Sequence, residues 1–155
     1  MTSKAYFEFI RLQVLELAQA RLEAECASES ASGASQRLGS IGHSAKDPDS
    51  RMIYATVAST RYDLLAREVA QELERATNIL YGADSRGGLA KARTSADADC
   101  ICGYYLQGLT WQQVANELVR PDSKDGAQWC RRRAMRAFKW MDSTGFGWES
   151  RCQNE

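Results

Sequence analysis

Positively charged and amide side chains that could bind nucleic acid are concentrated near the C-terminal end of the chain. The sequence has 155 residues, with 20 Lys and Arg and 20 Asp and Glu, so its formal net charge is zero. Residues 119–142 nevertheless hold 7 basic and 3 acidic residues, a local net charge of +4. Guanidinium and ammonium groups bind phosphates, and arginine and glutamine also hydrogen-bond to base edges. The segment therefore predicts a surface for double-stranded DNA. We expect this surface to contain Arg120, Lys124, Gln128, Arg131, Arg132, Arg133, Arg136 and Lys139.

The spacing of these residues predicts a two-faced helix over residues 126–141. Helical periodicity places the apolar and small side chains on a core-facing stripe, made of Cys130, Ala134, Ala137, Phe138 and Met141. The polar side chains fall on the opposite face, made of Gln128, Arg131, Arg132, Arg136 and Lys139. Arg133 lies nearer the edge of the core stripe.

Side chains that could support catalysis or bind a metal are few and poorly spaced. The sequence has five cysteines and one histidine, His43, so the pair Cys100 and Cys102 lacks the second pair of ligands that a zinc site needs. Asp97 and Asp99 fall in the first turn of a predicted helix, where carboxylates stabilise the helix dipole. We therefore expect no enzyme activity, no metal and no cofactor.

Two further predicted helices precede the basic helix and position it. The first helix ends at Gly108, and a capping box of Thr110 and Gln113 opens the second. A turn around Pro121 then leads to the basic helix. This order is typical of a helix-turn-helix unit, whose last helix lies in the DNA major groove. The predicted bounds of the three helices are 94–107, 111–118 and 126–141.

The same stretch resembles region four of sigma factors. Residues 102–118, CGYYLQGLTWQQVANEL, are similar to the opening pattern of that region, and residues 133–141, RAMRAFKWM, are similar to the close of its recognition helix. The layout of the chain also resembles phage-encoded regulators of late-gene transcription of the RinA and ArpU kind. Ala115 and Ala137 are 22 residues apart, several more than the usual pattern, and this excess predicts a longer turn between the helices.

The resemblance implies a DNA-binding transcription regulator encoded by a phage or prophage and present in the cytoplasm of the bacterial host. Two alternatives remain open, a sigma-like factor that docks on RNA polymerase and a small terminase-like DNA-packaging protein. A membrane protein is not expected, because no stretch approaches the roughly 20 consecutive apolar residues that a membrane span needs. Glu8, Arg11 and Glu16 interrupt the apolar N-terminal segment, so we expect an amphipathic helix there and not a signal peptide.

Apolar stripes predict two long helices over residues 4–27 and 50–80. The first stripe is Phe7, Ile10, Val14 and Leu17, and it is broadened by Leu12, Leu15 and Leu22. The second is Ile53, Val57, Leu64, Leu65, Val69, Leu73, Ala76 and Leu80. Each stripe must be buried, so we expect the helices to form an antiparallel pair or the core of a homodimer.

The predicted fold class is therefore all-α. A helical hairpin or coiled coil covers residues 1–80, with a serine- and glycine-rich flexible connector over 28–49. The helix-turn-helix domain covers residues 83–142, and residues 143–155 form a tail.

Overall fold

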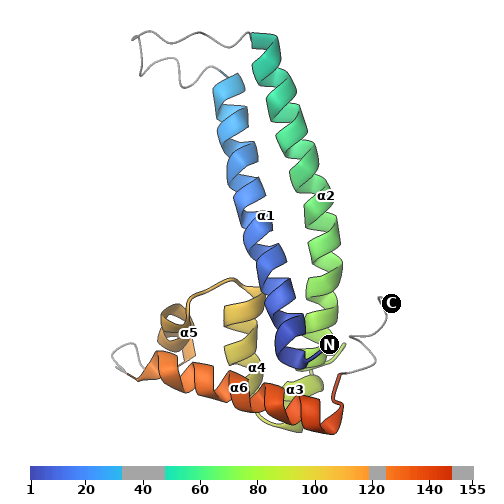
Figure 1. The fold of residues 1–155 in the computed structure, drawn as a ribbon, viewed down its shortest axis with the longest axis vertical. Coiled ribbons are helices and arrows are strands. Elements are labelled where there is room, and N and C mark those ends of the chain that lie inside the picture. Colours follow the sequence, from blue (N-terminus) through green and yellow to red (C-terminus); the bar gives the residue numbers. More distant parts are fainter. Residues whose placement is uncertain (33–47, 119–124, 148–155) are drawn as a thin grey trace. The chain divides into compact units, whose positions relative to one another are not determined.

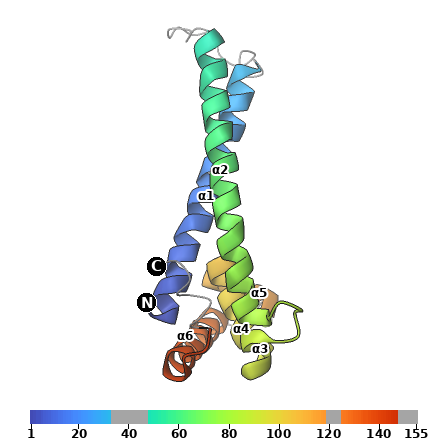
Figure 2. The same cartoon turned by 90° about the vertical axis from the view of Figure 1, so that its right-hand side faces the viewer.

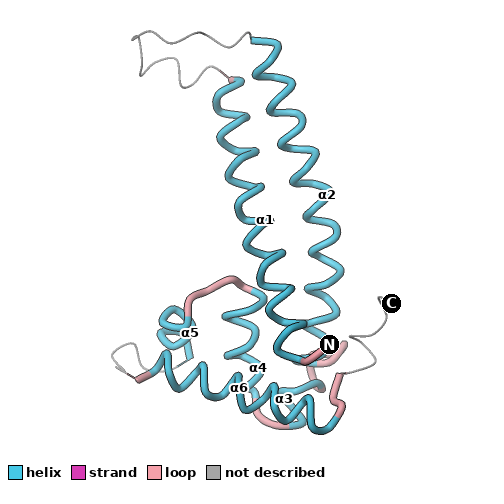
Figure 3. Tube along the Cα trace, in the orientation of Figure 1, coloured by secondary structure: helices cyan, strands magenta, loops and turns pink. Residues whose placement is uncertain are grey.

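The computed structural model describes residues 1–32, 48–118 and 125–147, and every regular element in them is helical (Figures 1 and 3). This confirms the predicted all-α class. No helix in these three ranges is long and apolar enough to cross a lipid bilayer. The elements are α1 (Ser3–Ala31), α2 (Pro48–Tyr81), α3 (Gly88–Ala92), α4 (Ser95–Ile101), the π-helical turn η2 (Cys102–Leu106), α5 (Trp111–Leu118) and α6 (Gly126–Thr144).

The chain forms two compact units, and the two long helices contribute to both. Unit 1 consists of Met1–Val14 together with Ala70–Glu155, and unit 2 consists of Leu15–Val69. The predicted domain boundary lay after residue 80 instead. The difference arises because the first turns of α1 and the last turns of α2 supply apolar side chains to the same core as α4 and α6.

In unit 2, α1 and α2 run antiparallel and side by side (Figures 1 and 2). The side chains buried in this unit are mostly small: Ala20 and Ala27 are each 3% exposed, and Ala24, Ala55 and Ala58 are half-buried. Small side chains therefore supply most of the buried contact between the two helices in this unit. The antiparallel pair predicted from the two stripes is present.

Several large apolar side chains of the long helices face water instead of a helix. Their exposed fractions range from 44% for Leu15 to 67% for Leu12. A pair of helices has one contact surface, so only residues on the facing side of each helix leave water. The antiparallel pair within one chain therefore does not bury Leu12, Leu15, Leu22, Ile53, Val57 and Leu64, and their burial in a homodimer stays a prediction.

Unit 1 is built around an aromatic and aliphatic core. The ring of Phe7 lies 6.2 Å from that of Tyr105 and 5.5 Å from that of Phe138, measured between ring centroids. Ile10 from α1 and Leu80 from α2 are fully buried in the same core. The first turns of α1 are thus part of the core that supports the C-terminal helices.

Asp142 on α6 fixes the N-terminal end of α1. Its Oδ1 accepts hydrogen bonds from the backbone N–H of Ser3, at 2.7 Å, and from the Ser3 hydroxyl, at 2.5 Å. The first turn of a helix has N–H groups without partners in the helix and a partial positive charge, so a carboxylate stabilises it. This contact joins residues 139 positions apart in the sequence.

Local signals set several helix ends as predicted. The Gln113 backbone N–H donates to Thr110 Oγ1 at 3.3 Å, and the Thr110 backbone N–H donates to Gln113 Oε1 at 2.8 Å, which is the predicted capping box. Gly82 and Gly108 follow helices with φ of +80° and +72°, a left-handed conformation that glycine adopts without strain. The last helix runs past the predicted end at residue 141 and stops at Gly145, with φ of +68°.

Two local features were not predicted. The short helix α3 begins at Gly88, and its residue Leu89 is fully buried in the core. The single helix predicted over 94–107 is α4 followed by the π-helical turn η2. In η2, a Cβ added at Gly103 would lie 2.8 Å from Val114 Cγ2, so η2 and α5 pack at the closest distance that glycine allows.

Candidate functional site

The outward face of α6 carries mostly polar and cationic side chains, with Met135 half-buried among them. Its opposite face is buried, through Cys130, Ala134, Ala137, Phe138 and Met141, which confirms the predicted core stripe. Within the described residues, no ion pair involves any of the four exposed cations of the outward face. The exposed residues are Gln128, Arg131, Arg132, Arg136 and Lys139.

Arg133 differs from its neighbours because the protein itself uses its guanidinium. Its Nε donates to Asp97 Oδ1 at 2.7 Å and its Nη2 donates to Thr94 Oγ1 at 2.6 Å. The other carboxylate oxygen of Asp97 accepts from Arg93 Nε at 2.9 Å, and the Asp97 side chain is only 3% exposed. Arg133 therefore ties α6 to the start of α4, and is less free than its neighbours to contact a ligand.

The role of Asp97 was missed in the sequence, where it was interpreted as a residue that stabilises the helix dipole. The signal that could have found part of this network is the short separation of the opposite charges Arg93 and Asp97, which lie on either side of the start of α4. The pairing with Arg133, 36 positions away, has no local signal.

A small buried cluster joins the three C-terminal helices. Cys100 of α4, Val114 and Ala115 of α5, and Cys130 of α6 are all at most 2% exposed and pack together. Because these side chains are small, α5 and α6 approach closely. The cluster holds the inner face of α6 and leaves its cationic face toward solvent.

Arg11 of α1 connects the first helix to the segment between η2 and α5. Its Nη1 donates to the carbonyl oxygens of Tyr104 and Leu109, the latter at 3.1 Å. Its guanidinium also lies 3.7 Å from the centroid of the Tyr104 ring, whose plane stacks on Trp111 with a centroid distance of 3.9 Å and an interplanar angle of 6°. The start of α5 is therefore fixed by contacts from α1 as well as by its own capping box.

The cysteines have the properties of structural thiols. Burial raises the pKa of Cys100, Cys102 and Cys130, so these groups are protonated at neutral pH and poor as nucleophiles or metal ligands.

Asp99 has a partner within the protein, because it accepts a hydrogen bond from the Tyr81 hydroxyl at 2.7 Å. In the described parts of the chain, no three His, Cys, Asp or Glu side chains are grouped so as to hold a metal ion.

Some of the predicted site residues lie outside the described residues. These are Arg120 and Lys124 in the predicted turn, together with Pro121, and also His43 in the predicted connector. Their expected roles remain predictions.

The outward face of α6 is hollowed along part of its length. A shallow hollow of about 400 Å³ is lined by Gln128, Arg131, Arg132, Met135 and Arg136. The cationic side chains thus surround a concave surface, so an inserted group could be contacted from more than one side.

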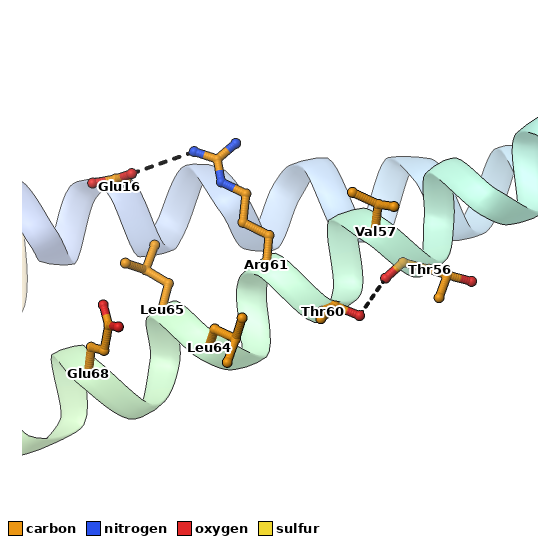
Figure 4. Close-up of a pocket in the computed structure, with 8 residues that line it drawn as sticks. All are labelled: Glu16, Thr56, Val57, Thr60, Arg61, Leu64, Leu65 and Glu68. Atoms are coloured by element: carbon orange, nitrogen blue, oxygen red, sulfur yellow. Dashed lines mark hydrogen bonds and ion pairs between the residues drawn. The ribbon is translucent and has the colours of Figure 1, made fainter.

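Unit 2 has a hollow of its own, shown in Figure 4. It has a volume of about 500 Å³, and its apolar lining includes Val57, Leu64 and Leu65. Arg61 Nη2 lies 3.5 Å from Glu16 Oε1 at its edge. This surface offers apolar contact beside the ion pair of Glu16 and Arg61.

Comparison with protein-family models, curated proteins and solved structures finds no match to this chain. The resemblance to region four of sigma factors and to phage late-gene regulators therefore remains a prediction from the motifs.

Proposed function

We propose that this protein is a DNA-binding transcription regulator of the phage type, in which α4, α5 and α6 act as a helix-turn-helix unit. The observation that carries the proposal is the division of α6 into a buried apolar face and an exposed face with four cations that no described acidic group pairs. Unpaired cations on a rigid helix suit a polyanion, and a helix fits the major groove of DNA.

Within this proposal the exposed residues of α6 have separate roles. Gln128, Arg132 and Arg136 follow one another at intervals of four residues, and we expect them to reach base edges. Arg131 and Lys139 lie beside this row and suit phosphate contacts. Arg133 supports the position of α6 through Asp97 and is not expected to contact DNA directly.

Selection of bound sequences from random duplex DNA tests the proposal with the full-length protein. An enriched motif establishes sequence-specific binding, and its symmetry reports whether one or two modules bind. Failure to enrich any sequence at low ionic strength would contradict the proposed function.

The adjacent residues Arg132 and Arg133 provide a matched pair of variants for the selected DNA. Arg132→Gln should weaken binding by roughly 5-fold to 150-fold, the equivalent of ~1–3 kcal/mol for one good base contact. Its free energy of unfolding should change by less than about 0.5 kcal/mol, since the side chain is exposed. Arg133→Gln should show the reverse, a lower stability with a smaller direct effect on binding. Wild-type affinity in Arg132→Gln would show that this face does not contact DNA.

Salt dependence measures how many phosphates the protein neutralises. About three to five contacts per protomer predict a slope of log K against log salt of about −3 to −4.5. Lys139→Gln should reduce the magnitude of the slope by about one and leave the sequence preference unchanged. Binding that does not respond to salt would place the cationic face away from DNA.

A second candidate is a sigma-like factor that docks on RNA polymerase. The observation in its favour is that two large apolar side chains, Leu118 of α5 and Trp129 of α6, are each 38% exposed, although DNA surfaces offer few apolar groups. Purified RNA polymerase should then bind the protein without DNA, and Trp129→Ala should weaken the complex. The third candidate, a DNA-packaging protein of the small terminase type, would form a ring, so the mass of the protein in solution tests it.

A further inference from the structure

A hollow of about 600 Å³ lies in unit 1 between α1, η2, α5 and α6. Its wall includes Lys4, Arg11, Tyr104, Trp111, Arg131 and Met135. Sites for small organic molecules have volumes of about 300–1,000 Å³ and combine apolar or aromatic walls with a few polar groups. The hollow has this size and this composition.

One wall of the hollow is a preformed stack of planar groups. Tyr104 lies between the Trp111 ring, at 3.9 Å, and the Arg11 guanidinium, at 3.7 Å. Arg11 is itself held by the carbonyl oxygen of Leu109 at 3.1 Å. Both faces of the Tyr104 ring are covered in this stack, so a ligand meets the ordered edges of these groups, and their order reduces the entropy lost on binding.

The charges around the hollow favour an anion. Three of its lining side chains are cationic, and the one carboxylate, Glu8, already lies 3.2 Å from the Lys4 ammonium group. Arg131 is exposed and has no ion-pair partner among the described residues. A ligand with an apolar aromatic body and one carboxylate would satisfy both the aromatic wall and this excess of positive charge.

We propose that this hollow binds a small aromatic carboxylic acid, with the carboxylate at Arg131 and the ring against the wall formed by Arg11, Tyr104 and Trp111. The ligand is held without any covalent step. Leu12 and Met135 supply apolar contacts at the edges of the hollow.

Occupation of this hollow would also affect the outward face of α6. Arg131 and Met135 line both this hollow and the shallower one on that face. A carboxylate bound at Arg131 removes that guanidinium from phosphate contact, so acid and DNA should weaken each other's binding. This coupling rests on the proposed function, whereas binding of the acid alone does not. Linkage requires the two effects to be equal in size.

Calorimetric titration of the full-length protein tests the site directly. The probes are salicylate, indole-3-acetate and naphthalene-2-carboxylate, each beside its neutral primary amide. At least one acid should bind with a Kd below about 1 mM, and its amide should bind at least about 10-fold more weakly, because one charge-assisted hydrogen bond is lost.

The adjacent arginines again give a matched control. Arg131→Gln should weaken binding of the acid by about 10-fold to 100-fold, whereas Arg132→Gln, which does not line this hollow, should leave it unchanged. Circular dichroism checks that both variants keep the wild-type helix content. The proposal is overturned if no acid binds up to about 5 mM, if acid and amide bind equally, or if Arg131→Gln binds like the wild type.

A DNA titration separates this proposal from the proposed function. With the selected DNA, saturating acid should lower the affinity of the wild type and have no effect on Arg131→Gln. Acid binding in a protein that binds no DNA would support the hollow and contradict the proposed function. DNA binding without any acid binding would contradict the hollow alone.

Discussion

At the scale of single residues, the decisive arrangement is one buried carboxylate between two guanidinium groups. Asp97 accepts hydrogen bonds from Arg93 and Arg133, at 2.9 Å and 2.7 Å, and joins α4 to α6. This contact separates the three consecutive arginines into two classes. Arg131 and Arg132 face solvent, and Arg133 holds the helix that presents them.

Asp97→Asn tests this network. An amide keeps the shape of the side chain but removes the charge that both guanidinium groups require. We expect the free energy of unfolding to fall by about 1–3 kcal/mol, measured by denaturant titration. The matched control is Glu117→Gln, at an exposed carboxylate of α5, which should change stability by less than about 0.5 kcal/mol. Equal stability of Asp97→Asn and the wild type would refute the role of Asp97.

A second prediction at this scale concerns alkaline pH. Burial, with a smaller effect of Glu8, raises the pKa of Tyr105 to about 12, from an ordinary value near 10. The unfolded chain therefore loses this proton before the folded protein does. The stability contributed by Tyr105 is complete below about pH 10 and is lost as the pH rises toward 12. Tyr105→Phe should reduce this loss by on the order of 1 kcal/mol, measured by unfolding between about pH 9 and pH 11. If the stability of Tyr105→Phe fell between these pH values as steeply as that of the wild type, the result would contradict the burial of the Tyr105 hydroxyl.

At the scale of elements, the position of α5 depends on the π-helical turn η2. The Gly103 position leaves no space for a Cβ, because Val114 Cγ2 would lie 2.8 Å from it. Gly103→Ala should therefore displace α5 and lower stability by roughly 1–3 kcal/mol, as in other overpacked cores.

The double variant Gly103→Ala, Val114→Ala provides the control for this clash. Removing the Cγ atoms of Val114 restores the space, so part of the loss in Tm should be recovered relative to the sum of the two single changes. If the losses in Tm of the two single variants simply add in the double variant, Gly103 of η2 and Val114 of α5 are not in close contact. The same variants should weaken binding to the selected DNA only as far as they disturb α6.

At the scale of the whole molecule, the first turns of α1 belong to the core of unit 1. Phe7 is fully buried and contacts Tyr105 and Phe138, so Phe7→Ala should cost about 3–5 kcal/mol. Leu22→Ala, at a position 56% exposed, is the matched control and should cost less than about 0.5 kcal/mol. Thermal unfolding measures both.

The same packing predicts the behaviour of a fragment over residues 83–147. This fragment lacks the buried side chains Phe7, Ile10, Ile79 and Leu80 of its own core. With about 65 residues and an incomplete core it should be unfolded, which far-ultraviolet circular dichroism would show. A cooperative unfolding transition in the fragment would contradict this account of unit 1.

The sequence by itself determined the features that depend on neighbouring residues. The capping box of Thr110 and Gln113, the left-handed glycines after α2 and η2, and the two faces of α6 all follow from groups within a few positions of one another. For this reason the helices and the exposed candidate residues of α6 could be predicted from local pattern alone.

Only the tertiary structure decided which apolar and charged groups are buried. Periodicity gave Phe7 and Ile53 the same expected burial, yet Phe7 is fully buried and Ile53 is 65% exposed. Residue type and charge placed both Arg132 and Arg133 on the predicted DNA surface, although Arg133 is bound to Asp97 at a separation of 36 positions. Burial and ion pairing depend on which helix faces each residue across a contact, and that partner is brought close only when distant segments pack together.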